Sequence, residues 1–224
     1  MASFVFISEK NRERYLKIVG PVGNLFAKTG IHPNVLSVTG LVLSLAAGVL
    51  YSQGIFFWAA WVVVLAGTCD TLDGQIARRN NKHSRFGAFF DSTVDRYSDL
   101  FLYIGLAYYF AGGRSLMQSP EPVSSVGSQP WTVTVIILAI AGSYMVSYAR
   151  ARGEGLGVEC TAGMMQRPER ITLLIVGSLL GAIPVAGTLL LKLTLIALAV
   201  STNITAIHRI LFIKERLLKE DQAE

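Results

Sequence analysis

The sequence has little charge and almost no cysteine. Charged residues make up 16% of the 224 positions, and the only cysteines are Cys69 and Cys160. Two cysteines this far apart exclude a disulfide-rich scaffold, and no C-x-x-C or H-E-x-x-H pattern supports a zinc site. The hydrophobic content of 52% excludes intrinsic disorder. Together with a mean hydropathy of +0.48, it indicates a membrane protein.

Six apolar runs approach the length needed to cross a bilayer. A helix needs about 20 residues at about 1.5 Å each to span a hydrocarbon core of about 30 Å. The runs are Asn34–Tyr51, Phe56–Ala77, Phe86–Ala111, Trp131–Tyr148, Ile171–Ile183 and Val185–Ile207. The fifth run is short, and only Pro184 separates it from the sixth. The sequence therefore predicts a single-domain, all-α integral membrane protein with six transmembrane helices, covering residues 1–224.

Lysine and arginine mark one side of these predicted spans. Of the 20 basic residues, only Arg114 lies in a loop on the opposite side, and Arg96 and Lys192 lie inside spans. Positive residues in short loops stay on the cytoplasmic side. We therefore expect a multi-pass protein of the cell membrane with both termini in the cytoplasm. The net charge of +5 is explained by this placement, so we expect no nucleic-acid partner.

The segment 10–28 alternates basic and apolar residues and contains no cleavable signal peptide pattern. Such alternation is typical of an amphipathic helix lying in the membrane interface. An ordinary polar tail is the alternative, because Pro21 and neighbouring glycines interrupt the pattern.

Five aspartates lie within thirty residues of the second and third predicted spans. Asp70, Asp73 and Gly74 lie on one helical stripe, and Asp91, Asp95 and Asp99 recur every four residues on another. Carboxylates inside a bilayer are costly unless they face a cavity, a partner or a metal ion. A short basic turn joins the two spans, so we expect antiparallel neighbouring helices whose carboxylates face each other.

Divalent cations remove the repulsion that such a carboxylate group would otherwise suffer. Oxygen ligands at this density suit Mg²⁺ or Mn²⁺, and two such ions can hold a phosphoryl group between an entering and a leaving oxygen. The active site would then lie near the cytoplasmic ends of the helices. A structural salt-bridge network with Arg78 and Arg96 is the alternative, but it uses at most two of the carboxylates.

The fixed positions of this region resemble a known motif. Asp70-x-x-Asp73-Gly74-x-x-Ala77-Arg78, eight further residues and Gly87-x-x-x-Asp91-x-x-x-Asp95 are similar to the complete motif of the CDP-alcohol phosphatidyltransferase family. The resemblance implies a reaction in which an alcohol displaces CMP from a CDP-linked lipid such as CDP-diacylglycerol. It implies metal ligation by Asp70, Asp73, Asp91 and Asp95, with Asp95 also acting as the general base.

The resemblance also implies a nucleotide and diphosphate site. Its residues would be Asp73, Gly74, Ala77, Arg78, Gly87 and Asn34. The Pro33-Asn34 pair resembles the entry of the family's first span, although it fits an ordinary helix start equally well.

Arginines at the cytoplasmic ends of the fourth and fifth spans suggest an acceptor pocket. The candidate residues are Ser147, Arg150, Arg167 and Arg170. Arginine forks bind phosphate oxygens in pairs, but basic residues at such positions are often only topology anchors. The stretch resembles the prokaryotic phosphatidylinositol-phosphate synthase branch, which implies inositol 1-phosphate as the acceptor. Glycerol 3-phosphate, serine or another polar alcohol are alternatives.

Two further interpretations concern the molecule as a whole. Small-residue stripes such as Gly177 with Gly181 favour close helix packing, and the resemblance implies a homodimer. A divalent-cation transporter is the alternative to an enzyme, but transport requires polar groups that continue to the far side. The outer half of the second span, residues 55–65, carries no side chain that coordinates a metal ion.

Overall fold

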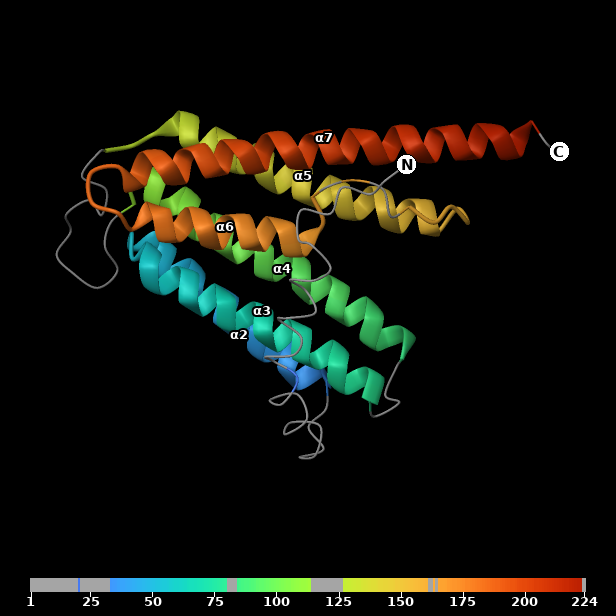
Figure 1. Ribbon diagram of the computed structural model, residues 1–224, viewed down its shortest axis with the longest axis horizontal. Coiled ribbons are helices and arrows are strands. Elements are labelled where there is room, and N and C mark those ends of the chain that lie inside the picture. The colour runs from blue at the N-terminus through green and yellow to red at the C-terminus, as the bar shows by residue number, and fades with distance from the viewer. Residues whose placement is uncertain are drawn as a thin grey trace.

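The computed structural model describes residue 20 and the ranges 33–79, 84–113, 127–160 and 165–222, together with residue 163; the side chains of residues 77–79 are not described. Its helices, shown in Figure 1, are α2 (Pro33–Ser52), α3 (Phe56–Arg79), α4 (Arg85–Phe110), α5 (Pro130–Glu154), α6 (Arg167–Gly181) and α7 (Gly187–Asp221). No strand occurs in these ranges. The predicted all-α fold is therefore confirmed, while the predicted interfacial helix at 10–28 lies outside the described residues except at Gly20.

Each predicted apolar run corresponds to a helix, but α5 and α7 are longer than predicted. They continue to Glu154 and Asp221 instead of ending near Tyr148 and Ile207. Hydropathy detects only the part of a helix that matches hydrocarbon, whereas backbone hydrogen bonding continues into the polar region beyond it. The break at Pro184 is confirmed, because a short turn over residues 182–186 separates α6 from α7.

Four of the described helices are long and apolar enough to cross a membrane: α2, α3, α5 and α7. The helix α4 is continuous, but charged residues interrupt its apolar sequence, among them Asp91, Asp95 and Asp99 on one stripe. The helix α6 has only 15 residues, which is short for a span of about 20 residues. The structure thus supports a protein with several membrane-spanning helices.

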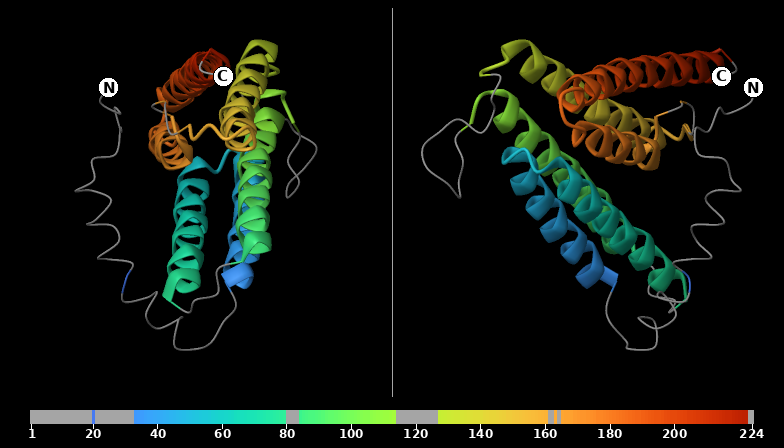
Figure 2. Two further views of the ribbon diagram at one scale, coloured as in Figure 1. Left: turned by 90° about the vertical axis from the view of Figure 1, so that its right-hand side faces the viewer. Right: turned by 60° about the vertical axis from the view of Figure 1, so that its left-hand side comes forward.

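The helices form two groups, which Figure 2 shows inclined to one another. In the first group α2 packs against both α3 and α4, and in the second α7 packs against both α5 and α6. Contacts of α3 with α6 and of α4 with α5 join the groups. The expectation that α3 and α4 are direct neighbours is wrong over most of their length, since α2 packs against both and no comparable interface joins α3 to α4 in the described ranges.

Small residues explain why α2 approaches two helices so closely. A Cβ atom added at Gly105 of α4 would collide with the backbone of Gly48 in α2, and one at Gly40 would meet the Ala66 carbonyl of α3 at 3.4 Å. Gly177 likewise faces Thr194 across the α6–α7 contact. These stripes therefore serve packing within the chain, and the homodimer stays a prediction.

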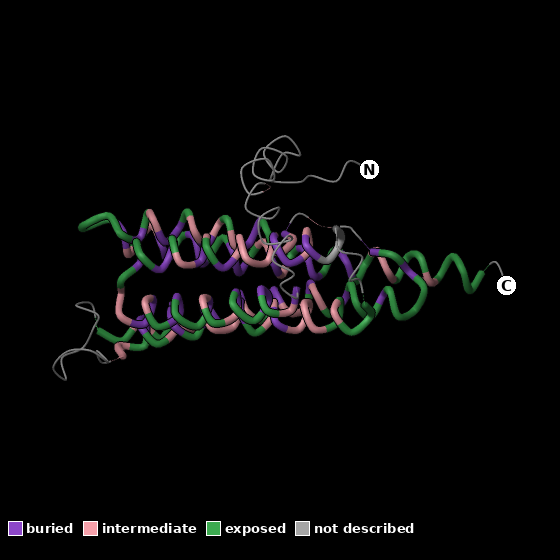
Figure 3. The backbone as a smooth tube through the Cα atoms, turned by 90° about the horizontal axis from the view of Figure 1, so that it is seen from below, coloured by how far each residue is buried: buried purple, intermediate pink, exposed green. Residues whose placement is uncertain are grey.

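The helices bury their inner sides and expose their outer sides, as Figure 3 shows by colour, and many of the exposed residues are large and apolar. On α2 the exposed stripe consists of Val35, Val38, Val42, Leu45 and Val49. In water such a stripe would favour aggregation, whereas lipid tails solvate it. Between the two groups, the buried Tyr51 hydroxyl on α2 and the Ser178 hydroxyl on α6 share a hydrogen bond of 2.6 Å. This contact satisfies both polar groups inside the apolar core.

Candidate active site

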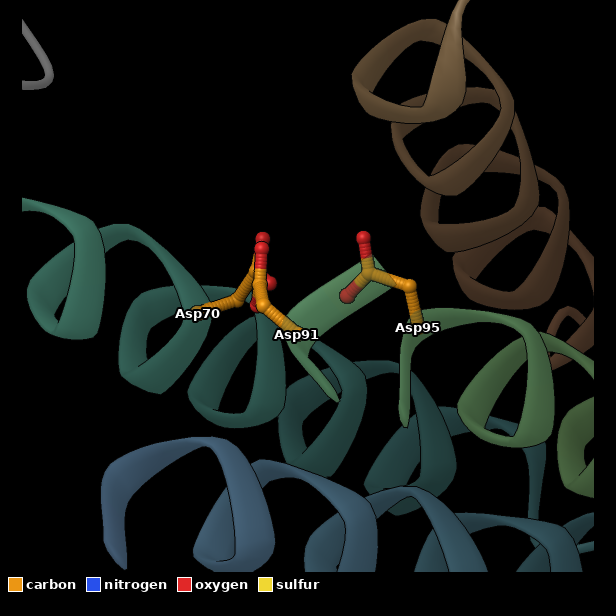
Figure 4. A group of neighbouring side chains, drawn as sticks. All are labelled: Asp70, Asp91 and Asp95. Carbon is orange, nitrogen blue, oxygen red and sulfur yellow. The ribbon is translucent and has the colours of Figure 1, made fainter. Parts of the chain in front are cut away.

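Three carboxylates from two helices meet at one place. Asp70 comes from α3, and Asp91 and Asp95 come from α4; each offers an oxygen atom, and these oxygens all lie within 4.8 Å of one another. Figure 4 shows the three side chains pointing into the same space. All three are half-buried. The expectation that the carboxylates of these two helices face each other is confirmed for this group, which we call the carboxylate cluster.

Asp73 lies one turn beyond Asp70 but is not part of the cluster. It is buried, and the Ser37 hydroxyl of α2 donates a hydrogen bond of 2.6 Å to its Oδ2 atom. This bond ties α2 to α3 at the cluster's end of the bundle. Ser37 was not predicted as a site residue, although it lies on the same polar and small-residue face of α2 as Gly40 and Ser44.

Arg167, at the start of α6, reaches directly into the carboxylate cluster. Its Nη1 atom lies 2.8 Å from Asp70 Oδ2 and 3.0 Å from Asp95 Oδ1. Its Nε atom lies 3.4 Å from Asp99 Oδ1. The sequence placed Arg167 at an acceptor phosphate, whereas the structure places it between the two helices that carry the aspartates.

Asp99 connects Arg167 to the second arginine of α6. It is buried at 4% exposure, and its Oδ2 atom lies 3.4 Å from Arg170 Nη2. Arg170 is equally buried and donates from Nη1 to the Ser143 carbonyl of α5 at 3.2 Å. The sequence showed Asp99 on the aspartate stripe without giving it a role. The salt-bridge network of the structure thus involves Arg167 and Arg170, whereas Arg96 donates to the Ser92 carbonyl.

The remaining predicted acceptor residues lie on the last turns of α5. Ser147 donates to the Ser143 carbonyl at 3.3 Å. Arg150 is half-exposed, and its Nε atom lies 2.8 Å from Glu154 Oε1. Neither contacts the carboxylate cluster, so the structure separates the candidate acceptor residues into an inner pair on α6 and an outer pair on α5.

Arg209 of α7 is an additional buried arginine at this end of the molecule. It is 3% exposed and donates from Nη1 to the Val146 carbonyl at 2.8 Å. Arg170 of α6 and Arg209 donate to carbonyls of α5 that lie about two turns and about one turn, respectively, before Arg150, so arginines of α5, α6 and α7 converge. Arg209 is one of the basic residues whose position in the sequence indicates the membrane orientation. Its spacing from the buried Thr202 and Thr205, which forms a polar stripe along α7, was the signal that it faces inward.

The predicted nucleotide residues are described only in part. Gly74 lies on α3 one turn beyond Asp70, and Asn34 lies in the first turn of α2. The backbone N–H of Gly87 donates to the Ser84 hydroxyl at 2.8 Å, which caps α4. The side chains of Ala77 and Arg78 lie outside the described residues.

The donor set fits a divalent metal ion. Its described members are all carboxylates, which are the ligands that Mg²⁺ and Mn²⁺ prefer. Asp70 and Asp95 already accept a cationic group, the guanidinium of Arg167, which shows that the site favours positive charge. The described part of the chain contains no comparable cluster of His, Cys, Asp and Glu.

Comparisons with known proteins agree with this geometry. Residues 30–208 match the model of the CDP-alcohol phosphatidyltransferase family. The chain is 29% identical to a phosphatidylinositol phosphate synthase of Streptomyces avermitilis, over 95% of this chain and 84% of the relative. It is 31% identical to an archaetidylinositol phosphate synthase of Methanothermobacter thermautotrophicus, over 90% of this chain and 91% of the relative.

Solved structures show the same fold. The phosphatidylinositol phosphate synthase of Mycobacterium tuberculosis with CDP-DAG bound has a TM-score of 0.74 and 28% identity, over 88% of this chain and 94% of that one. Its complex with manganese and citrate has a TM-score of 0.74 and 27% identity, over 87% and 88% of the two chains. The chain belongs to the CDP-alcohol phosphatidyltransferase family and is therefore an enzyme of phospholipid biosynthesis.

Proposed function

We propose that this enzyme transfers a phosphatidyl group from CDP-diacylglycerol, or a similar CDP-linked lipid, to inositol 1-phosphate and releases CMP. The observation that carries the choice of acceptor is the convergence of arginines from α5, α6 and α7 beside the carboxylate cluster. A phosphorylated polyol gains contacts with these arginines that a free polyol or serine lacks. The relatives named above are phosphatidylinositol phosphate and archaetidylinositol phosphate synthases, and the solved structures are of a phosphatidylinositol phosphate synthase, which supports the same choice.

In this proposal the phosphate of the acceptor binds at an arginine pocket, and its hydroxyl points toward the cluster. We define the arginine pocket as Ser147, Arg150, Arg170 and Arg209. Arg170 and Arg209 are held rigidly, because each donates to a carbonyl of α5. Fixed donors lose little freedom on binding, which favours a specific phosphate over a diffuse anion surface. Arg167 joins this pocket only when it leaves the carboxylates.

The metal site is assigned to Asp70, Asp91 and Asp95, with Asp73 adjacent and held by Ser37. When bound, Mg²⁺ or Mn²⁺ would neutralise the diphosphate of the donor and polarise the phosphorus that is attacked. The manganese complex of the Mycobacterium tuberculosis enzyme supports this assignment. The residues Asp73, Gly74, Ala77, Arg78, Gly87 and Asn34 are proposed to flank the nucleotide and its diphosphate.

Asp95 is proposed as the general base. It removes the proton from the acceptor hydroxyl, whose oxygen then bonds to phosphorus as the bond to the CMP oxygen breaks. Asp95 lies one helical turn beyond Asp91, on the side of the buried Asp99 and the arginines of α6. This position lies between the metal-holding residues and the arginine pocket, where an acceptor hydroxyl would arrive.

We further propose that all six helices cross the membrane, with an interfacial helix at 10–28 and both termini in the cytoplasm. The bias of lysine and arginine toward the loops at one end supports this orientation. The carboxylates on α4 face inward to the cluster instead of to lipid, which removes the main objection to α4 as a span. The cytosolic substrate and CMP would then reach the site from the cytoplasmic side.

The proposal is tested by measuring CMP release from purified protein with CDP-diacylglycerol and Mg²⁺. We expect inositol 1-phosphate to support faster release than free inositol, serine or glycerol 3-phosphate. A preference for serine or free inositol would contradict the arginine pocket. A preference for glycerol 3-phosphate would keep the pocket and change the acceptor.

A further inference from the structure

The position of Arg167 raises a question about the metal site. Two of the carboxylates that would hold a divalent ion already form ion pairs with a guanidinium, since Nη1 of Arg167 contacts both Asp70 Oδ2 and Asp95 Oδ1. Two of the three carboxylates of the cluster are therefore engaged by one internal cation. A guanidinium and a divalent ion cannot share these oxygens, because like charges at such distances repel strongly.

We propose that Arg167 is a positioning residue that acts as the internal counter-ion of the metal site and exchanges with the metal. Without a metal ion, it neutralises the repulsion between Asp70 and Asp95. Metal binding displaces its Nη1 end from the cluster. This inference rests on the proposed function, because it requires that the cluster binds the metal.

Asp99 makes such an exchange possible without loss of the arginine from the site. It contacts Arg167 through Nε, at the opposite side of the guanidinium from the shared Nη1 atom. Asp99 is outside the carboxylate cluster and nearly inaccessible at 6% side-chain exposure, whereas the Arg167 side chain is 22% exposed. The contact with Asp99 therefore remains when Nη1 is released, and the guanidinium turns about this anchor.

The released Nη1 end lies close to the arginine pocket. Asp99 also pairs with Arg170, so the same anchor holds Arg167 beside a pocket residue. Once free of Asp70 and Asp95, Arg167 can donate to a phosphate oxygen of a substrate. Metal loading would thus complete the phosphate site and expose the proposed base in one step.

Mn²⁺ binding to metal-stripped full-length protein tests the exchange without an activity readout. Free Mn²⁺ is measured by electron paramagnetic resonance during titration of the wild type, Arg167→Gln and Arg150→Gln. We expect Arg167→Gln to bind Mn²⁺ at least about tenfold more tightly, because the competing cation is gone. Arg150→Gln removes the same charge, but Arg150 lies at the end of α5 and does not contact the carboxylate cluster. The Mn²⁺ affinity of this variant should therefore stay within about twofold of the wild type.

An affinity of Arg167→Gln equal to or weaker than that of the wild type would overturn the exchange. Absence of saturable Mn²⁺ binding in the wild type and both variants would instead contradict the proposed metal site, and the exchange with it. If Arg167→Gln does not fold, a structure of the wild type with Mn²⁺ decides the question. In that structure we expect Nη1 of Arg167 to lie beyond ion-pair distance of Asp70 and Asp95. If Arg167 kept both ion pairs while Mn²⁺ was bound, the exchange would be refuted.

Discussion

Asp95 lies deeper in the carboxylate cluster than Asp70, with a side chain 21% exposed against 35%. This difference in exposure agrees with the roles assigned to the two residues, Asp70 as a metal ligand and Asp95 as the general base. A base must meet the acceptor hydroxyl away from the bulk solvent. Replacing Asp95 by Asn removes the proton acceptor, while the carboxylates of Asp70 and Asp91 remain to hold the metal ion. We expect Asp95→Asn to lower kcat by at least about 100-fold while leaving metal-dependent binding of the CDP-lipid largely intact.

The matched variants for this prediction are Asp70→Asn and Asp91→Asn. They remove a charge from the metal site itself and should lose both turnover and metal-dependent binding. Binding of a CDP-lipid analogue and CMP release are measured on the same preparations. If Asp95→Asn retained most of the wild-type turnover, a group other than Asp95 would have to remove the proton.

The arginine pocket makes a separate prediction about the acceptor. Removal of a charge-assisted hydrogen bond costs about 1.5–3 kcal/mol, so Arg170→Gln should raise the KM for inositol 1-phosphate by about tenfold or more. The KM for CDP-diacylglycerol should change much less, because the lost contact is to the acceptor. Arg152→Gln is the control, since Arg152 is exposed at the end of α5 and outside the pocket. Equal effects on both KM values would place Arg170 in the donor site.

At the scale of single residues, the sequence predicted the carboxylate cluster well and the arginines poorly. The aspartates are identified by spacing within one helix and the next, and a helix turns by a fixed angle per residue. The contact of Arg167 with Asp70 joins residues 97 positions apart, and it depends on how α6 packs against α3. No pattern within either helix contains that information. Arg209 differs, because its spacing from Thr202 and Thr205 on α7 did indicate that it faces inward.

At the scale of helices, close approach between α2 and α4 depends on two glycines. A side chain at Gly105 would overlap the backbone at Gly48, and backbone atoms cannot move aside as a flexible side chain can. We expect Gly105→Ala to destabilise the protein by about 1–3 kcal/mol, measured by thermal unfolding in detergent. Because α4 carries Asp91 and Asp95, Mn²⁺ affinity should fall as well.

Gly67→Ala provides the matched control on α3. Nothing lies within 4 Å of a Cβ atom added at Gly67, and alanine is the better helix former. This variant should be as stable as the wild type or slightly more stable. Similar losses for Gly67→Ala and Gly105→Ala would show that the α2–α4 contact is not the cause.

The sequence predicted where the helices lie along the chain, but it did not predict which helices pack against each other. Apolar runs identified α2 through α7, and the break at Pro184 was placed correctly. The connection between α3 and α4 is short, which suggested direct packing, but the small residues of α2 draw both helices onto α2 instead. Chain connectivity restricts where a helix begins, and side-chain size decides which neighbour it approaches most closely.

At the scale of the whole molecule, the membrane orientation is open to a direct test. Cys160 is 1% exposed and is therefore a poor labelling site. New cysteines at the exposed Ser128 and Leu156, with Cys69 and Cys160 replaced by Ala, would report on the two ends of α5. An impermeant thiol reagent should label Ser128→Cys in intact cells and Leu156→Cys only after permeabilisation. The reverse labelling pattern would place the active site on the outer side of the membrane, away from the cytoplasm into which CMP is proposed to be released.

The central claim is that the cluster and the arginine pocket together select a phosphorylated polyol. The most direct measurement is a competition in one vessel, with CDP-diacylglycerol, Mg²⁺ and equal amounts of inositol 1-phosphate, inositol, glycerol 3-phosphate and serine. Mass spectrometry then identifies the lipid products. The account predicts a dominant lipid that carries both the transferred phosphate and the intact phosphate of inositol 1-phosphate, and no product when the metal is chelated. A dominant product from inositol or serine, or a product that forms despite chelation, would contradict it.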